Sequence, residues 1–403
     1  MSRNIDFIPF ALPCLGKEEE EAVIKVMRSG WLTTGKETTA FEREFAEKVG
    51  SKHAIALNSA TAGLHLSLET QDIPEDSWVI TTPYTFTATA EIIRYKNAHP
   101  LFVDIDEISL NIDPFKIEDT IKRTGTEKNI RGIIPVHTGG HPCAMEEIMA
   151  IAGREELFVT EDAAHAFPSF FKGKAAGTWG NTGVYSFYAT KTITTGEGGM
   201  VVTDDDEIAD RIKCLRLHGI DREVWNRYQS KKLAPWEYDV VAAGYKYNPT
   251  DISSAMGRVQ LKRAEAFLKE RISIARFYLE SFRNIPELIL PAEAGGHTWH
   301  LFIIRLNLDR ISCSRDEFMN FLSEEGIGTS VHYKPLHLMT YYKEKYNLSP
   351  EDFPVSTRIF NSCVSLPIYP GMTEEQKERV VRAVRTTIGA SVKRSVTGVE
   401  YDS

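Results

Sequence analysis

Short apolar runs alternate with amphipathic segments through the first two thirds of the chain. The runs predict buried strands, and the segments with apolar residues every three or four positions predict helices. We expect strands at 53–57, 78–81, 100–103, 132–136, 157–160, 184–187 and 200–203. We expect helices at 18–29, 39–49, 62–68, 85–95 and 145–151. This alternation is typical of an α/β fold, with a mainly parallel sheet covered by helices on both faces.

The pattern changes near Asn248-Pro249-Thr250-Asp251, where a long helical stretch begins and runs to about residue 282. Beyond it we expect a strand at 300–306, a helix at 315–325, a short strand at 329–332 and a last helix from residue 373. Thr373 and Gln376 are spaced as in a capping box. The chain therefore divides into a large domain over residues 1–250 and a small C-terminal α+β domain over 251–403, which includes the bridging helix.

Composition excludes several classes of protein. The formal charge is −9 and the basic residues are scattered, so nucleic acid is not an expected partner. The five cysteines show no CxxC spacing and are odd in number, which favours a reducing cytoplasm over a disulfide framework. The N-terminus lacks the apolar stretch of a signal peptide, and no segment is long enough to insert into a membrane.

Three features lie at predicted strand ends, where parallel sheets bind ligands. Residues 58–61 join a strand to a helix, and the free amides of a first helical turn suit a phosphate, although a plain N-cap would have the same sequence. Asp162 follows a buried strand and needs a partner. It could pair with a protonated ring nitrogen, or it could be an N-cap or part of a structural ion pair. Lys191 lies between a strand and a Gly-rich turn, with Ser186 five residues earlier. Taken alone, Lys191 would be one surface lysine among many.

A phosphate turn, an acid and a lysine in this order meet the needs of pyridoxal 5′-phosphate, which requires a phosphate site, a carboxylate for its ring nitrogen and a covalent anchor. A free lysine has a pKa of about 10.4, so burial is needed to make its amine nucleophilic. His137, His141 and His165 could suggest a metal site. The Gly139-Gly140 pair favours a loop between the first two, however, so no metal is predicted.

A series of short segments in fixed order carries a family resemblance from about residue 8 to residue 388. The segments are SGWLTTG (29–35), NSATAG (58–63), PYTF (83–86), IPVH (134–137), EDAAHA (161–166), SFYATK (186–191), GEGG (196–199), YKYN (245–248), WHL (299–301) and SLP (365–367). Together they resemble the DegT/StrS-type nucleotide-sugar aminotransferases, a branch of the fold-type I pyridoxal-phosphate enzymes. Segments 161–166 and 326–332 look closest to the enzymes that form UDP-4-amino-4-deoxy-L-arabinose for lipid A modification.

The resemblance implies roles around the cofactor ring. Lys191 would hold pyridoxal 5′-phosphate as a Schiff base and then move a proton between carbons, and Asp162 would pair with the ring nitrogen. His165 would lie beside the ring and Phe86 would stack on it. Packing in the core is an alternative role for Phe86.

The resemblance also implies contacts to the phosphate and the substrate. The backbone amides of Ala60 and Thr61 and the hydroxyl of Ser186 would bind the phosphate. Asn248 would reach the phosphate from the neighbouring subunit, so that a homodimer shares its active sites, although a structural cap or turn is the alternative. His332 is expected near the sugar.

The implied reaction moves an amino group from L-glutamate to a nucleotide-linked keto sugar, with UDP and a 4-keto group favoured, in cell-envelope glycan or lipid A biosynthesis. The alternatives are a 3-keto UDP-N-acetylglucosamine-type aminotransferase, a sugar dehydratase that does not transaminate, and a regulatory homologue. Related dehydratases carry histidine at the lysine position, so Lys191 favours amination. The chain shows no match to the C-terminal arginine motif of amino-acid aminotransferases, which favours a sugar acceptor.

Overall fold

A computed structural model describes residues 6–221 and 238–391. Its larger layer is a seven-stranded sheet in the order β1-β9-β8-β5-β4-β2-β3. The strands are β1 (His53–Leu57), β2 (Trp78–Thr81), β3 (His99–Phe102), β4 (Ile130–Ile134), β5 (Phe158–Asp162), β8 (Thr182–Ser186) and β9 (Gly199–Thr203). Neighbouring strands run parallel except at β9, which is antiparallel to both β1 and β8. The predicted mixed, mainly parallel sheet is therefore confirmed.

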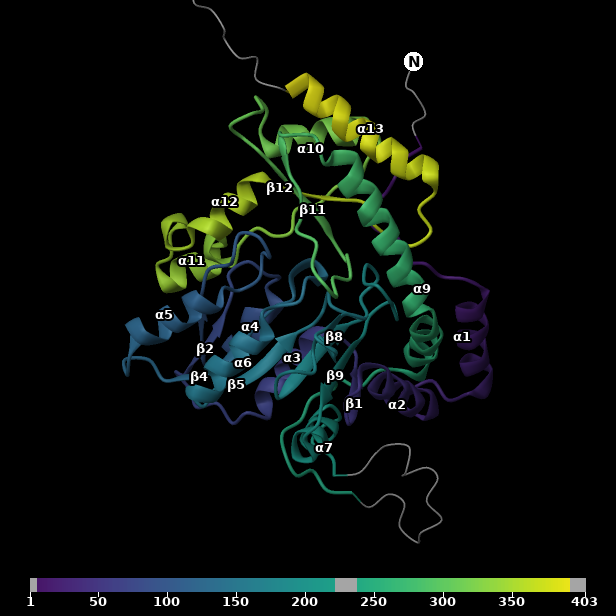
Figure 1. The fold of residues 1–403 in the computed structure, drawn as a ribbon. Helices are drawn as coiled ribbons and strands as arrows, with labels where there is room; N and C mark the ends of the chain where they lie inside the picture. The colour runs from purple at the N-terminus through teal and green to yellow at the C-terminus, as the bar shows by residue number, and fades with distance from the viewer. Residues whose placement is uncertain (1–5, 222–237, 392–403) are drawn as a thin grey trace, which may run out of the picture.

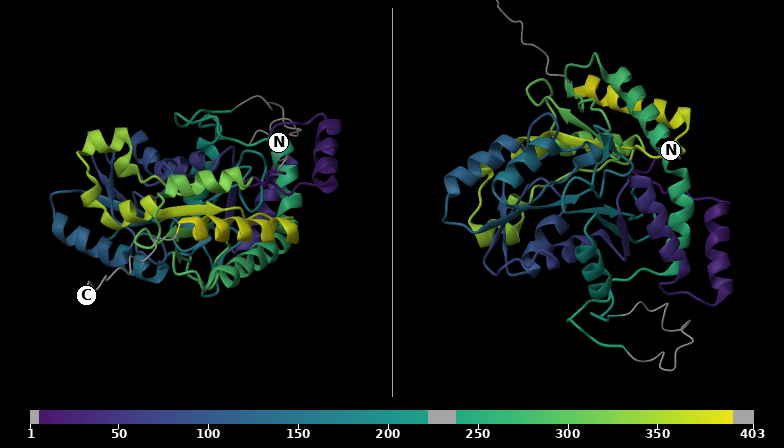
Figure 2. Two further views of the ribbon diagram at one scale, coloured as in Figure 1. Left: turned by 90° about the horizontal axis from the view of Figure 1, so that it is seen from above. Right: turned by 60° about the horizontal axis from the view of Figure 1, so that its bottom comes forward.

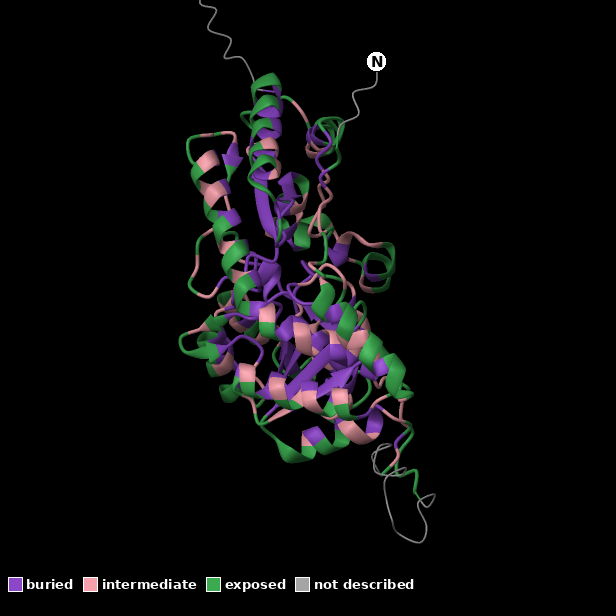
Figure 3. Ribbon diagram, turned by 90° about the vertical axis from the view of Figure 1, so that its right-hand side faces the viewer, coloured by how far each residue is buried: buried purple, intermediate pink, exposed green. Residues whose placement is uncertain are grey.

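Helices cover both faces of this sheet, because successive strand residues point to opposite sides. Ala54 and Ala56 pack in a core with α2 (Lys36–Val49) and α9 (Asp251–Phe282). Ile55 and Leu57 pack in a core with α3 (Ala60–Glu69), α4 (Ala88–Tyr95) and α7 (Asp206–Leu215). The helices of this layer are α1 (Lys17–Ser29), α2 (Lys36–Val49), α3 (Ala60–Glu69), α4 (Ala88–Tyr95), α5 (Pro114–Thr124), α6 (Met145–Arg154) and α7 (Asp206–Leu215). Figure 3 shows the buried strands between helices whose outward residues are exposed.

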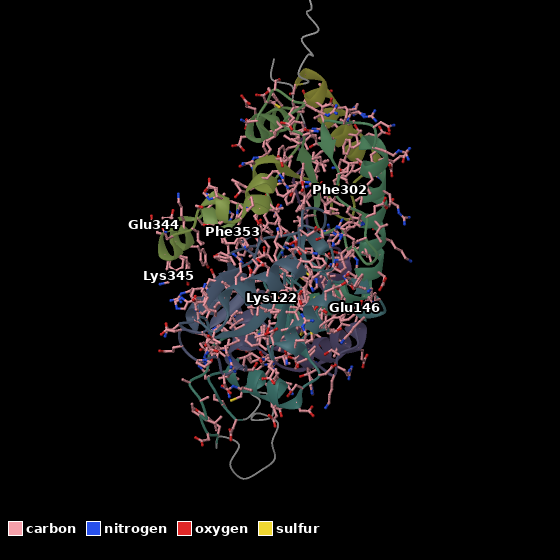
Figure 4. All side chains as sticks on the ribbon, turned by 60° about the vertical axis from the view of Figure 1, so that its left-hand side comes forward. Lys122, Glu146, Phe302, Glu344, Lys345 and Phe353 are labelled. Carbon is pink, nitrogen blue, oxygen red and sulfur yellow. The ribbon has the colours of Figure 1, made fainter. Side chains whose placement is uncertain are left out.

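A smaller unit sits above the large sheet (Figure 1). Its antiparallel sheet consists of β10 (Leu288–Ile289), β11 (Phe302–Leu306) and β12 (Cys363–Leu366). Its helices are α10 (Arg315–Glu324), α11 (Thr340–Tyr346), α12 (Pro354–Ser362) and α13 (Glu374–Ser391). Figure 4 shows Phe302 inside this unit, and Glu344 and Lys345 at the outer edge of α11.

Helix α9 (Asp251–Phe282) contributes to the cores of both layers. Leu261 and Phe267 pack with the large sheet, whereas Tyr278 and Phe282 pack in the small unit. Figures 1 and 2 show α9 running from beside α1 up to α13. Ile8, near the start of the chain, also lies in the core of the small unit. The domain division at residue 250 stays a prediction.

The structure corrects some predicted elements. The strand predicted at 329–332 is wrong, because Ser330 makes a single bridge to Ser365 and the chain then turns toward the large sheet. The helix predicted at 85–95 begins at Ala88. The remaining short elements are β6 (Phe170–Phe171), β7 (Lys174–Ala175), η1 (Thr138–Gly140), η2 (Leu336–Leu338) and η3 (Pro350–Asp352). Within the described ranges, no helix is long and apolar enough to cross a membrane.

Candidate active site

A cavity of about 490 Å³ lies between the carboxyl ends of the large-sheet strands and the small unit. This volume is typical of a small-molecule site. All of the residues predicted from the sequence except Asn248 line it, namely Ala60, Thr61, Phe86, Asp162, His165, Ser186, Lys191 and His332. The fold therefore brings together side chains from separate strand ends.

The start of α3 forms one end of the cavity. Ser59 caps the helix by accepting a hydrogen bond from the amide of Ala62 at 3.1 Å. The first-turn amides of Ala60 and Thr61 have no partner within the helix, and they lie at the positive end of its dipole. A Cβ at Gly199 would stand 2.6 Å from the nitrogen of Ala60, so only glycine allows β9 to approach this turn so closely. The result is a cradle of backbone amides that suits a phosphate.

Asp162 ends β5 in the middle of the cavity and is 6% exposed. Its carboxylate accepts hydrogen bonds from the Thr89 hydroxyl at 2.7 Å and from the Ala164 amide at 3.1 Å. Burial raises the pKa of Asp162, and these hydrogen bonds and the nearby charge of Lys191 partly oppose that effect. A carboxylate held in this way would be stabilised by a cationic group placed in the cavity.

Lys191 follows β8 after a short turn in which its amide donates to the carbonyl of Tyr188 at 2.9 Å. Burial lowers the pKa of Lys191 to about 8, against the opposing charge of Asp162. No ion pair within 4.0 Å joins these two described residues, although each influences the pKa of the other. A lysine with this pKa is deprotonated far more often at neutral pH than a free lysine, and its amine can act as a nucleophile.

These residues fit pyridoxal phosphate. The helix cradle suits the phosphate, the Asp162 carboxylate suits a ring nitrogen, and the Lys191 amine suits a covalent anchor. Ser186, at the end of β8, pairs with Gly199 beside the cradle. Phe86 is 62% exposed at the cavity wall, which excludes the alternative that it packs in the core. An exposed aromatic ring at this place is free to stack on a planar ligand.

Two histidines lie on the side of the cavity that faces the small unit. His165 accepts a hydrogen bond at Nδ1 from the amide of Gly139 at 3.3 Å, and its Nε2 lies 3.0 Å from the hydroxyl of Tyr333. His332 is half-buried, and its Nδ1 lies 2.8 Å from the Ser365 hydroxyl. Burial lowers the pKa of His332 to about 4 and that of His165 well below its usual range, with the charge of Lys191 adding to both effects. Both rings are therefore neutral at physiological pH.

His137 lies behind the cavity and belongs to a buried network. Its Nε2 lies 3.0 Å from the Glu161 carboxylate, and its Nδ1 accepts a hydrogen bond from the Cys143 amide at 3.0 Å. Glu161 also accepts hydrogen bonds from the amides of Gly177 and Gly180, each at 2.8 Å. The neighbours Glu161 and Asp162 thus face opposite ways, and only Asp162 faces the cavity.

Asn248 lies outside the cavity of its own chain. Its side chain donates to the Thr34 hydroxyl at 2.7 Å and accepts from Lys246. Asn248 precedes the N-terminus of α9, where Thr250 caps the helix. Its predicted contact with the phosphate of a neighbouring subunit stays a prediction.

Sequence reasoning gave no role to several residues that line the cavity. The clearest are Phe10, Glu197 and Tyr333. His300, which flanks Trp299, was expected to be structural or substrate-facing, and it also lines the cavity. The available signals were that Glu197 lies in the segment GEGG and that Tyr333 follows His332 directly.

Comparisons with known proteins show the family to which the chain belongs. The model of the DegT/DnrJ/EryC1/StrS aminotransferase family matches residues 13–385. The uncharacterized protein MJ1066 of Methanocaldococcus jannaschii is 48% identical, over 95% of this chain and 98% of its own length. The spore coat polysaccharide biosynthesis protein SpsC of Bacillus subtilis is 42% identical, over 95% of this chain and 97% of its own.

Solved structures of similar chains share the fold. The Helicobacter pylori aminotransferase PseC, which is involved in the biosynthesis of pseudoaminic acid, has a TM-score of 0.88 at 29% identity, covering 96% of this chain and 100% of that chain. The PLP form of Spr1654 from Streptococcus pneumoniae has a TM-score of 0.86 at 28% identity, covering 96% and 99%. The predicted fold-type I architecture is thereby confirmed. The chain is an enzyme that belongs to the DegT/DnrJ/EryC1/StrS aminotransferase family, whose members use pyridoxal phosphate.

Proposed function

We propose that the protein transfers an amino group from L-glutamate to a nucleotide-linked keto sugar, with a UDP-linked 4-keto sugar as the favoured acceptor. The observation that carries the proposal is the Lys191 amine, which lines the same cavity as Asp162 and has its pKa lowered to about 8 by burial. An enzyme that dehydrates a sugar without aminating it has no need of this lysine. A regulatory homologue would have no need of the Lys191–Asp162 pair.

Lys191 is proposed to act as covalent anchor and as proton carrier. Once the substrate amine has displaced it, its Nζ is a neutral base inside a partly closed cavity. It would remove a proton from the carbon that bears the glutamate amine, and would return a proton to the sugar carbon that receives nitrogen. When bound, pyridoxal phosphate supplies the electron sink for these proton transfers.

The remaining roles concern placement of the cofactor. We propose that Asp162 keeps the ring nitrogen protonated, and that Phe86 and His165 fix the plane of the ring. The amides of Ala60 and Thr61, together with the Ser186 hydroxyl, would bind the phosphate. Asp162 and Ser186 end the neighbouring strands β5 and β8 in the middle of the large sheet, and Ala60 and Thr61 begin the helix that follows the edge strand β1. The rigid sheet therefore fixes the spacing of these residues.

A sugar acceptor is supported by the lining of the cavity. No arginine belongs to that lining in the described part of the chain, so the site offers no guanidinium clamp for a second keto acid. SpsC belongs to polysaccharide biosynthesis and PseC to pseudoaminic acid biosynthesis, which supports a role in cell-envelope glycan synthesis. Lipid A modification is the narrower version of this proposal, and a 3-keto UDP-N-acetylglucosamine acceptor is its alternative.

A homodimer with shared sites is part of the proposal. Asn248 does not line the cavity of its own chain and bonds Thr34 instead, and Lys246 beside it is exposed. In a shared site, Asn248 would reach the partner's phosphate. Lys246 would bring a second cation for the glutamate carboxylates, because Lys191 is the only lysine or arginine that lines the cavity in the described part of the chain.

A panel of nucleotide-linked keto sugars tests the proposed function. The purified protein, loaded with pyridoxal phosphate, is incubated with L-glutamate and each sugar, and 2-oxoglutarate and the position of the new amine are measured. We expect stoichiometric 2-oxoglutarate and an amine at C4 of a UDP-linked sugar. An amine at C3 would replace the 4-keto assignment, and loss of water without amination would identify a dehydratase.

A further inference from the structure

The protonation state of His165 follows from its two hydrogen bonds. A backbone amide can only donate, so the bond from Gly139 to Nδ1 requires that Nδ1 carries no proton. Because burial keeps the ring neutral, its single proton lies on Nε2. The Nε2–H group therefore donates to the hydroxyl oxygen of Tyr333, at 3.0 Å.

This assignment fixes the direction of the Tyr333 hydroxyl. Its oxygen accepts from His165, so its own proton must be donated elsewhere. No described residue accepts that proton, although Tyr333 lines the cavity with its ring nearly parallel to that of His165, at an interplanar angle of 12°. The chain of bonds from Gly139 through His165 thus presents an oriented O–H donor to the cavity. Leaving this donor unpaired in a ligand complex would be costly.

The surroundings of Tyr333 indicate which ligand takes the proton. The anchors for the cofactor belong to the large sheet, whereas His300, His332 and Tyr333 belong to the small unit on the opposite side. His300 is 5% exposed, and its Nδ1 has no hydrogen-bond partner among the residues that the structure describes. Burial keeps His300 neutral by lowering its pKa well below the usual range. This wall therefore offers neutral hydrogen-bonding groups, which suit the hydroxyl and keto oxygens of a sugar better than a carboxylate.

We propose that Tyr333 is a specificity-determining residue that donates a hydrogen bond to an oxygen of the sugar ring, with His165 as the positioning residue that orients its hydroxyl. The inference rests on the proposed function, because it names the part of the cavity that recognises the sugar. It predicts that Tyr333 contributes to the sugar half of the reaction and not to the glutamate half.

The test separates the two half-reactions of the holoenzyme carrying Tyr333→Phe. Stopped-flow absorbance follows the cofactor after mixing with L-glutamate, and then after mixing the aminated enzyme with a UDP-linked 4-keto pentose. We expect an unchanged rate and apparent affinity for glutamate. For the sugar, we expect kcat/KM to fall about 10- to 100-fold, the loss of one well-oriented hydrogen bond.

Two controls keep this result specific. Tyr341→Phe removes a hydroxyl from an exposed tyrosine on α11 and should leave both half-reactions unchanged. Inhibition by UDP alone should be equal in wild type and Tyr333→Phe, because the proposed hydrogen bond is to the sugar and not to the nucleotide. Thermal unfolding of both variants verifies that each is folded.

The outcomes distinguish this inference from the function on which it rests. If wild type aminates the sugar and Tyr333→Phe does so equally well, the inference alone is wrong. If the variant slows the glutamate half-reaction and shifts the pH dependence of cofactor absorbance, Tyr333 donates to the cofactor and the inference is also wrong. If wild type reacts with glutamate but aminates no nucleotide-linked keto sugar, the proposed function is wrong and so is this inference.

Discussion

The two walls of the cavity differ in charge and in the way the chain builds them. The wall on the large sheet carries Asp162 and Lys191, which lie at or just after adjacent strands. The wall on the small unit carries His300, His332 and Tyr333, which are neutral and come from loops. A charged wall of fixed spacing suits chemistry that is the same for every substrate. A neutral wall built from loops can differ between enzymes that act on different sugars, while the chemistry at the charged wall stays the same.

Removal of the Lys191 amine should have the largest effect on the charged wall. We expect Lys191→Ala to lower kcat about 10⁴-fold or more, because the anchor and the proton carrier are lost together. The variant should still bind pyridoxal phosphate non-covalently, through the cradle and Asp162. Release of 2-oxoglutarate and cofactor absorbance measure both effects, with the exposed Lys343→Ala on α11 as control. Robust turnover by Lys191→Ala would show that the reaction does not require the charged wall.

Neutralising Asp162 should have the next largest effect. A carboxylate about 4 Å from a ring cation is worth roughly 4 kcal/mol at an effective dielectric near 20, before desolvation. We therefore expect Asp162→Asn to reduce kcat/KM about 100- to 1000-fold and to lose cofactor more readily on dialysis. Kinetics equal to wild type would refute the role assigned to this carboxylate.

The adjacent residue Glu161 should affect stability instead. Glu161→Gln loses an acceptor in a fully buried network with Gly177, Gly180 and His137, so the free energy of unfolding of the apoenzyme should fall by about 2 kcal/mol. Asp162→Asn should lower the free energy of unfolding less. Burial raises the pKa of Asp162 because it disfavours the charged carboxylate, and the substitution removes that charge. Urea denaturation at pH 7 compares the two variants. A larger fall in the free energy of unfolding for Asp162→Asn than for Glu161→Gln would contradict this prediction.

The smallest predicted effect is a pH dependence. The neutral Lys191 amine is the nucleophile, so its capture of pyridoxal phosphate should speed up as the pH rises and level off above about 8. Absorbance of the apoenzyme mixed with cofactor at a series of pH values gives the midpoint. A midpoint near that of free lysine, at about 10.4, would show that the cavity does not lower this pKa.

The charged wall could be predicted from the sequence because its parts are local. Asp162 and Lys191 each follow an apolar strand, and parallel topology alone places those strand ends together. Helices α5 and α7 were missed although Asp113 and Asp205 cap them. Those capping residues would have located both helices.

Of the neutral wall only His332 was predicted, through the family resemblance, because tertiary contacts position the rest. The Thr298 hydroxyl donates to the carbonyl of His165 at 2.9 Å, and the Leu301 amide donates to the carbonyl of Gly139 at 3.1 Å. These bonds hold His300 beside His165, with ring centroids 4.4 Å apart. The partners lie more than a hundred residues apart in the chain, and no local pattern reports such a contact.

The most direct test of the two-wall account is a crystal structure of Lys191→Ala with pyridoxal phosphate and a UDP-linked 4-amino sugar. The account predicts that the ring nitrogen lies within hydrogen-bond distance of Asp162 and that the sugar lies against His300 and Tyr333. A sugar bound away from the small unit, or a ring nitrogen turned away from Asp162, would contradict it.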